Sequence, residues 1–305
     1  MYFGKKVLAV VGAVLVLLAQ SGFALDGEVG IIFSSPNDQY KKAIEGCKQY
    51  LKSQQFTGMV TEYVLATTAP DEVMKQVAAK KTKCIIALGP EAARLVRDKA
   101  DGVPAVVSMV VNLNDYRASG ITGVSIEVTP EVKMKQFGAM CTGVKTIGVL
   151  YSEQGRAGYE AMIEAGKTIG ATIVGVKVEN DQEINTTLPS LLSQVDVFFF
   201  TLDKLYSLQS VKLVLHESMK NKKPSIGLSH FYTKAGAMVS FDCDYADIGA
   251  QAGEMAGKIL NGTAVSSIMP QSPRKVVYSL SMATARTIGC NIPTKVVDEA
   301  VEVIW

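Results

Sequence analysis

A strand–helix alternation that begins twice along this chain constrains its fold more than any other feature. The first series starts at Glu28, with strands expected at 28–34, 58–66, 84–88 and 103–111 and helices at 38–53, 70–80 and 90–99. The second series starts at Lys145, with strands expected at 145–151, 172–178, 196–201 and 224–228 and helices at 155–170, 182–193 and 206–220. Such alternation is typical of mainly parallel sheets with helices on both faces. We therefore predict an α/β fold of two lobes that share one topology.

Two lobes of like topology, placed side by side, leave a cleft between the carboxyl ends of their strands, where open α/β sheets bind small molecules. The chain continues with a strand and a helix in 237–262 and a strand at 276–281, so it must cross between the lobes more than once. The expected hinges are 125–130, 241–245 and 269–275. We assign residues 25–126 and 244–268 to an N-terminal lobe, and residues 127–243 and 269–305 to a C-terminal lobe.

The first 24 residues have the pattern of a secretory signal peptide. Lys5 and Lys6 precede an apolar core at 7–19, and small residues, Gly22 and Ala24, stand where cleavage is expected. An uncleaved membrane anchor is the alternative, but the apolar core is shorter than the roughly 20 residues that a spanning helix needs. No cysteine follows the core as an attachment point for lipid. We therefore expect export to a periplasm.

Charge and cysteine spacing exclude several classes of function. Lys5 and Lys6 are the only charged residues of 1–24, so the rest of the chain carries no net formal charge, which argues against nucleic acid as a partner. The five cysteines, at 47, 84, 141, 243 and 290, form no C-x-x-C pair, so we expect no metal and no cofactor. Their odd number leaves at least one thiol unpaired. One disulfide is possible, and its partners cannot be read from spacing.

Catalytic motifs are missing from the sequence. It contains no P-loop, no nucleophile elbow and no H-E-x-x-H, and the glycines of "GATIVG" (170–175) do not form a G-x-G-x-x-G fingerprint. A protein that only binds its ligand requires none of these. We therefore expect a binding protein and not an enzyme.

Several motifs, taken in order, resemble those of a known family. They are "CIIALGPEAARLV", "VPAVVSMVV", "ITGVS", "KTIGVLY", "KAGAMVSFDCDYADIGAQAGEMAGKILNG" and "SMATARTIGCNIPTKVVDEAVEVI". Together they are similar to the substrate-binding components of ABC importers of the tryptophan/tyrosine type, over nearly all of residues 28–304. The resemblance implies a type I periplasmic binding fold, a monomer that closes about a hinge on a small ligand, often an aromatic amino acid, and delivery to an ABC permease. A sensor that presents its ligand to a membrane receptor kinase is the alternative, because it would use the same fold and the same closure.

Residues just after the expected strands should face the cleft. In the first lobe these are Ser34, Ser35, Gly89, Pro90 and Asn112, and Gly89 and Pro90 also begin a helix whose free N–H groups could hold a carboxylate. In the second lobe they are Tyr151, Ser152, Asp203, Lys204, Tyr206, His230 and Phe231. Asp242 lies in an expected hinge.

The chain departs from the family pattern at some of these positions. Asn112, Ser152 and His230 stand where many members carry aspartate, asparagine and aspartate, and Lys204 stands where a small amide is common, whereas Asp203 matches. An amino-acid site needs an anion for the ligand ammonium, because a buried unpaired charge is costly. The departures therefore favour a more anionic ligand, or a neutral aromatic one stacked on Phe231, Tyr206 or Tyr151.

Other interpretations of these residues need no ligand. Lys204 can be a solvated loop lysine, and Phe231 can close the core beneath a loop. His216, inside a helix, is expected at the surface. Tyr159 and Met162 lie on the apolar face of the helix at 155–170 and are expected in the core.

Overall fold

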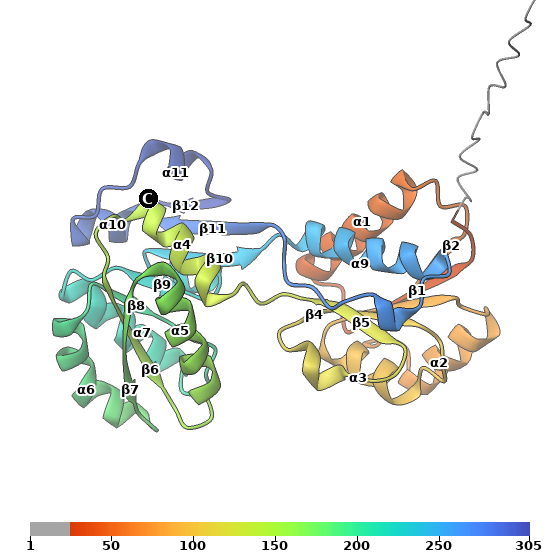
Figure 1. The fold of residues 1–305 in the computed structure, drawn as a ribbon, viewed down its shortest axis with the longest axis horizontal. Helices are drawn as coiled ribbons and strands as arrows, with labels where there is room; N and C mark the ends of the chain where they lie inside the picture. The colour runs from red at the N-terminus through yellow and green to blue at the C-terminus, as the bar shows by residue number, and fades with distance from the viewer. Residues whose placement is uncertain (1–24) are drawn as a thin grey trace, which may run out of the picture.

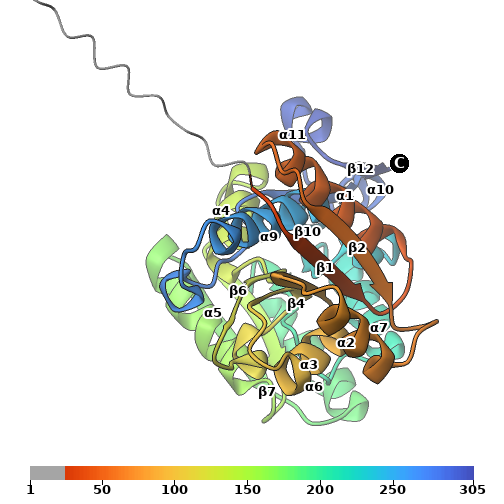
Figure 2. The same cartoon turned by 90° about the vertical axis from the view of Figure 1, so that its right-hand side faces the viewer.

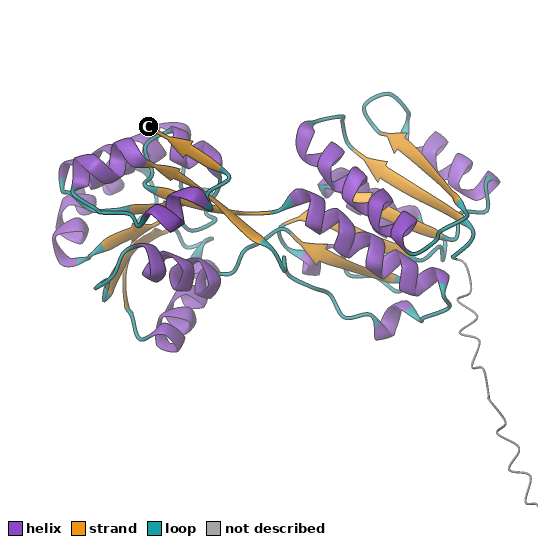
Figure 3. Ribbon diagram, turned by 90° about the horizontal axis from the view of Figure 1, so that it is seen from above, coloured by secondary structure: helices purple, strands orange, loops and turns teal. Residues whose placement is uncertain are grey.

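The computed structural model describes residues 25–305 and contains two α/β lobes joined by thin connections (Figures 1 and 3). Each lobe has one twisted sheet between layers of helices, as the repeated alternation predicts. The expected signal peptide at 1–24 lies outside the described residues. Within 25–305, no helix combines the length and the apolar character that a membrane crossing requires.

The first lobe contains a five-stranded sheet in which every pair of neighbours is parallel. Its order is β2-β1-β3-β4-β5. The strands are β1 (Glu28–Phe33), β2 (Met59–Val64), β3 (Cys84–Leu88), β4 (Ala105–Val110) and β5 (Ile121–Ser125). Every residue of β3 and β4 is buried, which agrees with their near-continuous apolar sequence.

Helices cover both faces of this sheet (Figure 2). On one face lie α1 (Asp38–Ser53) and α9 (Tyr245–Leu260), and on the other lie α2 (Pro70–Ala79) and α3 (Pro90–Lys99). Pro70 and Pro90 occupy the first helical position, as predicted, because proline lacks the N–H that would be unpaired there. Asn37 caps α1 by accepting a hydrogen bond from the Tyr40 N–H. A 3-10 turn at Leu113–Tyr116 joins β4 to β5.

Helices α1 and α9 pack with their backbones in contact. A Cβ atom at Gly46 of α1 would overlap the carbonyl group of Ala246, and one at Gly249 of α9 would overlap that of Ala43. Glycine at both positions lets the helices approach this closely, and the buried side chains of Ala43 and Cys47 fill the contact. A helix that lies between two strands of the second lobe in the sequence, β10 and β11, thus completes the core of the first lobe.

The second lobe contains a seven-stranded sheet of order β12-β11-β10-β9-β8-β6-β7. The strands are β6 (Thr146–Tyr151), β7 (Thr172–Lys177), β8 (Val197–Phe199), β9 (Ser225–Gly227), β10 (Val239–Cys243), β11 (Val276–Ser281) and β12 (Glu302–Ile304). Only β10 and β11 are antiparallel to each other. The C-terminal end of the chain pairs with β11 and so belongs to the second sheet.

The helices of the second lobe again lie on both faces of its sheet. On one face are α4 (Pro130–Met140), α5 (Arg156–Ile169) and α10 (Met282–Ile288), and on the other are α6 (Asp181–Gln194) and α7 (Leu208–Lys220). Two short helices, α8 (His230–Lys234) and α11 (Thr294–Asp298), lie near the β11 and β12 edge. Helix α4 is absent from the sequence prediction, because it directly follows a segment interpreted as a hinge.

The chain passes between the two sheets three times (Figure 1). Residues 126–129 join β5 to α4, Asp244 joins β10 to α9, and the third crossing leads from a 3-10 turn at Val265–Ser267 to β11. These crossings fall within or next to the three segments expected as hinges.

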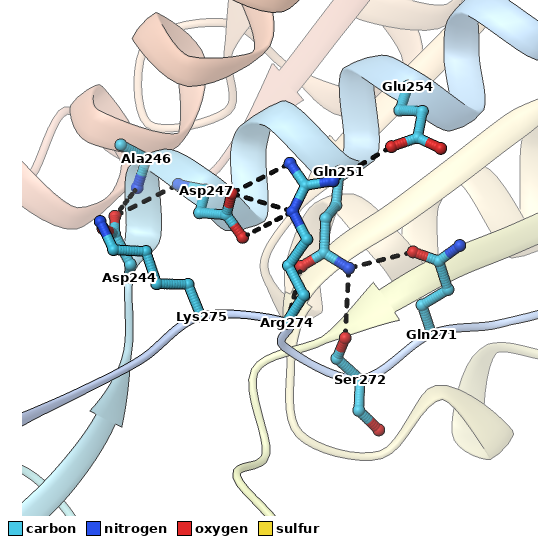
Figure 4. A network of polar contacts seen from close by, with 9 residues as sticks. All are labelled: Asp244, Ala246, Asp247, Gln251, Glu254, Gln271, Ser272, Arg274 and Lys275. Atoms are coloured by element: carbon cyan, nitrogen blue, oxygen red, sulfur yellow. Dashed lines mark hydrogen bonds and ion pairs between the residues drawn. The ribbon is translucent and has the colours of Figure 1, made fainter.

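A polar network holds the third crossing against helix α9 (Figure 4). Arg274 Nε donates to both carboxylate oxygens of Asp247 at 3.0 Å, and Arg274 Nη1 donates to Glu254 at 3.1 Å. The Gln251 side-chain amide donates to Gln271 Oε1 at 3.0 Å and accepts the Arg274 backbone N–H at 3.2 Å. Residues 271–274 of the crossing are therefore tied to α9 by side-chain hydrogen bonds.

The edge of the first sheet holds the same crossing. Gln271 forms a parallel bridge with Val124, and its backbone bonds to Gly123 and Ser125. Further on, the Asp244 N–H donates to the Lys275 carbonyl at 3.1 Å. The third crossing thus contacts the edge of the first sheet at Gln271 and the second crossing at Lys275, both past the boundary at 268 and 269 assigned from sequence.

Candidate ligand-binding site

A cavity of about 490 Å³ lies where the strand ends of the second sheet meet the first and second crossings. Its walls come from the first crossing, from α4, from the first turns of α5 and from the ends of β8, β9 and β10. The first lobe contributes Val111 and Asn112, which follow β4, and Tyr245 at the start of α9. This is the cleft position that two lobes of like topology predict.

Lys133 of α4 is a buried cation in the wall of this cavity. Its side chain belongs to a residue that is only 8% exposed, and Nζ lies 6.0 Å from the centre of the Phe199 ring. Within residues 25–305 no carboxylate lies at ion-pairing distance from it. Burial lowers the pKa of the Lys133 ammonium, and the more distant carboxylates of Glu127 and Asp242 oppose that shift. The cavity therefore presents one positive charge without a direct partner.

Asp242 of β10 provides a carboxylate in the same cavity. It accepts hydrogen bonds from the Cys243 N–H at 2.8 Å and from the Tyr245 hydroxyl at 3.1 Å. Gln39 of α1 donates to the same Tyr245 hydroxyl at 3.1 Å. Burial raises the pKa of Asp242, and the nearby His230 and the two donors oppose the shift. A chain of hydrogen bonds thus connects this carboxylate to a helix of the first lobe.

The remaining walls are mainly apolar. Phe199 and Phe241 are buried beneath the cavity, and Met162 and Leu228 line it beside them. Met162 belongs to the core, as expected, and touches the cavity as well. The Thr201 hydroxyl, at the end of β8, is buried without a hydrogen-bond partner in the described part of the chain. Such a floor suits the flat apolar part of a small molecule, with Thr201 as an additional polar contact.

Asp203 and Ser152 support the cavity from behind. The Asp203 carboxylate accepts the Ser152 N–H at 2.7 Å, the Ser152 hydroxyl at 2.8 Å and the Leu205 N–H at 2.9 Å. A Cβ atom at Gly155, which lines the cavity, would overlap this carboxylate. Asp203 therefore shapes the turn at the start of α5, and its oxygen atoms are engaged within the protein.

The tyrosines predicted for the site lie elsewhere. The Tyr151 ring stacks on Tyr159, with centroids 4.2 Å apart and 7° between the planes. The Tyr206 hydroxyl donates to the Leu150 carbonyl at 2.8 Å, and its ring packs edge-on against Phe200. Neither side chain lines the cavity, so both serve the packing of the second lobe in this conformation.

His230 and Phe231 begin helix α8. His230 lines a second cavity, of about 580 Å³, which shares Asp242 and Tyr245 with the first. Phe231 is 51% exposed and lines neither cavity. Lys204 is also exposed and lies outside both, which agrees with a solvated loop lysine. His216 is exposed, as expected.

Four predicted residues of the first lobe follow β1 and β3 and lie outside the cavity. They are Ser34, Ser35, Gly89 and Pro90. Gly89 has a φ of 92°, and a side chain there would strike the Tyr40 hydroxyl group, so only glycine fits this helix start. Of the first-lobe residues predicted for the site, Asn112 alone lines the cavity, where it also caps the turn after β4.

Sequence reasoning missed Lys133, Glu127, Gln154 and Thr201 as cavity residues. A signal for Lys133 was present, because it stands four residues before Phe137 on the apolar face of "PEVKMKQFGAM". Lysine is rarely buried unless its charge is paired, so a lysine at a core position of an amphipathic helix indicates a binding partner for that charge. Within residues 25–305, no cluster of three or more His, Cys, Asp or Glu side chains is placed to bind a metal ion.

Comparison with known proteins gives one family and several relatives. A family model described as ABC transporter substrate binding protein matches residues 28–304. A tyrosine-binding protein of Clostridioides difficile (strain R20291) is 21% identical over 207 residues, which make up 64% of this chain. The match spans 60% of the length of that relative.

Solved structures share the fold over most of the chain. The ligand-free, open structure of a substrate binding protein with adhesive properties from Clostridium difficile has a TM-score of 0.77 at 19% identity, covering 91% of this chain and 99% of that chain. An ABC domain in complex with L-Trp from Streptococcus pneumonia has a TM-score of 0.56 at 19% identity, and the match covers 90% of this chain and 100% of that chain. The predicted two-lobed periplasmic binding fold is thereby confirmed.

Proposed function

Because this chain belongs to the family of ABC transporter substrate-binding proteins, as its motifs predict, we propose that it is the periplasmic solute-binding component of an ABC importer. Its ligand is an aromatic amino acid or a closely related aromatic carboxylate. It acts as a monomer, without a cofactor, and delivers this ligand to a permease. The family is described by substrate binding, so the proposal includes no catalytic residues.

The observation that carries this ligand class is that one cavity contains a buried ammonium group, Lys133, together with the carboxylates of Asp242 and Glu127. Lys133 presents a buried ammonium group that has no ion-pair partner in the described part of the chain, and Asp242 presents a carboxylate in the same cavity wall. A zwitterion supplies the complement of both: its carboxylate binds Lys133 and its ammonium group binds Asp242. Each contact is a charge-assisted hydrogen bond, the stronger class of such bonds.

The apolar floor supports an aromatic side chain on that zwitterion. Phe199 and Phe241 lie beneath the cavity and Leu228 beside it, and aromatic rings pack favourably against such groups. The relatives named for tyrosine and solved with L-Trp bind ligands of this chemistry. The departures at Asn112, Ser152 and His230 do not remove the ammonium partner, because Asp242 supplies it.

Closure of the lobes completes the site in this proposal. Ser34, Ser35, Gly89 and Pro90 follow first-lobe strands, yet the cavity is lined mainly by the second lobe. Rotation about the three crossings would bring the first-lobe strand ends over the ligand. The ligand shifts the equilibrium toward the closed form because it contacts both lobes only there.

The test deletes one charge of the ligand at a time. Isothermal titration of the protein with L-tryptophan, tryptamine and indole-3-propionate compares the zwitterion with analogues that lack the carboxylate or the ammonium group. We expect tryptophan to bind most tightly, and the same order for the tyrosine and phenylalanine series. Equal affinity for all three compounds, or heat from none of the aromatic series, would refute the proposed ligand class.

Two variants assign each charge to its partner. In Lys133→Met, tryptophan and tryptamine should bind with similar affinity, because the carboxylate has lost its cation. In Asp242→Asn, tryptophan and indole-3-propionate should bind with similar affinity. Lys135→Met is the matched control, because Lys135 is an exposed lysine on the same helix and should leave the order unchanged.

A further inference from the structure

Two cysteines far apart in the sequence bring their sulfur atoms together in the second lobe. Cys141 Sγ and Cys290 Sγ lie 2.8 Å apart, although the residues are 149 positions apart in the chain. Cys141 caps the C-terminus of α4, and Cys290 follows the glycine that ends α10. Both side chains pack at the edge of the same apolar core. Within residues 25–305, no other two cysteine sulfurs are in hydrogen-bond contact.

The backbone holds both cysteines in place. The Cys141 N–H donates to the Phe137 carbonyl and the Cys290 N–H donates to the Ala285 carbonyl, each at 2.9 Å. The sulfur atoms therefore meet because two helix ends fix them, and not because a loose loop carries one toward the other.

The other three cysteines differ from this pair in the solvent exposure of their thiol groups. Cys47, Cys84 and Cys243 are at most 1% exposed, and burial raises the pKa of each thiol. Cys141 and Cys290 are partly exposed at a surface cavity of about 370 Å³. A hydrogen bond from Cys290 lowers the pKa of Cys141 to about 7, so Cys141 is the better nucleophile.

From this geometry we propose that Cys141 and Cys290 form a disulfide bond when the protein meets a disulfide-bearing oxidant. The Cys141 thiolate attacks one sulfur atom of the oxidant, forms a mixed disulfide and releases a thiolate. Cys290 loses its proton and attacks Cys141 Sγ, which releases the second thiolate of the oxidant. The pair gives up two protons and two electrons, and the oxidant disulfide is reduced to two thiols.

The bond would stabilise the second lobe without restricting its movement against the first. Both cysteines belong to the core of the second lobe, so the bond spans none of the three crossings. It would tie the end of α4 to the segment that leads into α11 and β12, and it would close a long loop of the unfolded chain. Cross-links across long loops reduce the freedom of the unfolded chain most strongly.

Thiol counting on the full chain tests this proposal. The native protein is incubated with glutathione disulfide, quenched with acid, unfolded without reductant and alkylated with iodoacetamide. Intact mass should then show three alkyl groups, on Cys47, Cys84 and Cys243, against five after treatment with dithiothreitol. Peptide mapping without reduction should find the peptide of Cys141 joined to that of Cys290.

Matched variants separate this bond from others. Cys243→Ser should keep the cross-link, whereas Cys141→Ser and Cys290→Ser should lose it. The oxidised wild-type protein should melt several degrees above the reduced protein, and Cys290→Ser should show no such difference. Five alkyl groups after oxidation, or a cross-link that joins other cysteines, would overturn the proposal. The ligand-induced rise in Tm should be the same in the oxidised and reduced forms, and a rise abolished by oxidation would contradict a bond confined to one lobe.

Discussion

Replacing Lys133 by methionine should change ligand affinity and protein stability in opposite directions. Methionine keeps the length and the apolar stem of lysine and removes only the ammonium group. A hydrogen bond to a charged group contributes about 1.5–3 kcal/mol, so losing the contact with the ligand carboxylate should weaken binding about 10- to 150-fold. This loss applies to ligands with a carboxylate and not to their decarboxylated analogues.

The ligand-free variant should be more stable than the wild-type protein. Burying an unpaired ammonium group destabilises the folded protein by several kcal/mol. The cation–π contact with the Phe199 ring, 6.0 Å from Nζ, offsets only about 0.5–2 kcal/mol of this. Because Lys133 lines a cavity and is not enclosed by protein on every side, we expect a net gain of about 1–2 kcal/mol for Lys133→Met. At about 2–4 °C per kcal/mol, Tm should rise by a few degrees.

The pH dependence of this gain follows from the lowered pKa of Lys133. In the unfolded chain the lysine titrates near 10.4. Between the lower pKa of the folded protein and that value, the unfolded chain binds more protons than the folded protein, so wild-type stability rises with pH. The advantage of Lys133→Met should therefore be complete at pH values below the folded pKa and should shrink as the pH approaches 10.4.

Calorimetry with and without ligand measures both effects on the same samples. Differential scanning gives the Tm of the ligand-free proteins at several pH values, and titration gives the affinities, with Lys135→Met as the control. The reasoning is refuted if Lys133→Met is less stable than the wild-type protein and binds the zwitterion equally well. Lys133 would then support the fold and have no role in ligand binding.

Three further predictions concern the supports of the site and the movement of the lobes. Gly155→Ala should lower the free energy of unfolding by about 1–3 kcal/mol, because the new methyl group displaces Asp203 from its hydrogen-bond donors. In the control Gly138→Ala, where the space around the new methyl group is open, the same melting assay should show no decrease in stability. Arg274→Met should lower the free energy of unfolding by about 1 kcal/mol, because Asp247 loses a bidentate partner. This decrease should be smaller at high salt. A decrease that is independent of salt would show that the network contributes mainly through packing. Saturation with ligand should reduce the radius of gyration in small-angle scattering, and an unchanged radius would rule out lobe closure.

The sequence predicted the architecture well because its strongest signals are local and periodic. The strand–helix alternation that restarts at Lys145 predicted two separate sheets, and the expected hinge segments contain or adjoin the three crossings. The end of the third crossing could not be predicted, since it depends on Arg274 and Gln271 meeting partners far away in the sequence. Spacing alone carries no information about such contacts.

The site was harder to predict, because strand ends locate loops but not the directions of side chains. Asn112 lines the cavity, as expected for a residue that follows a strand, and Asp242, from an expected hinge, lines it too. Tyr206 follows β8 as expected but turns inward to the Leu150 carbonyl. Asp203 was expected to meet a ligand and instead meets the backbone of the neighbouring strand end. Lys133 could have been found only by asking why a lysine stands among core positions.

The contact between α1 and α9 determines the order in which the chain can fold. Gly46 and Gly249 let the two helices touch, and α9 ends at Leu260, after strands β6 to β10 of the second lobe and before β11 and β12. Until then, α1 has no cover for the apolar face that carries Ala43 and Cys47. The first lobe can therefore close its core only once α9 has been synthesised, after strands β6 to β10 of the second lobe.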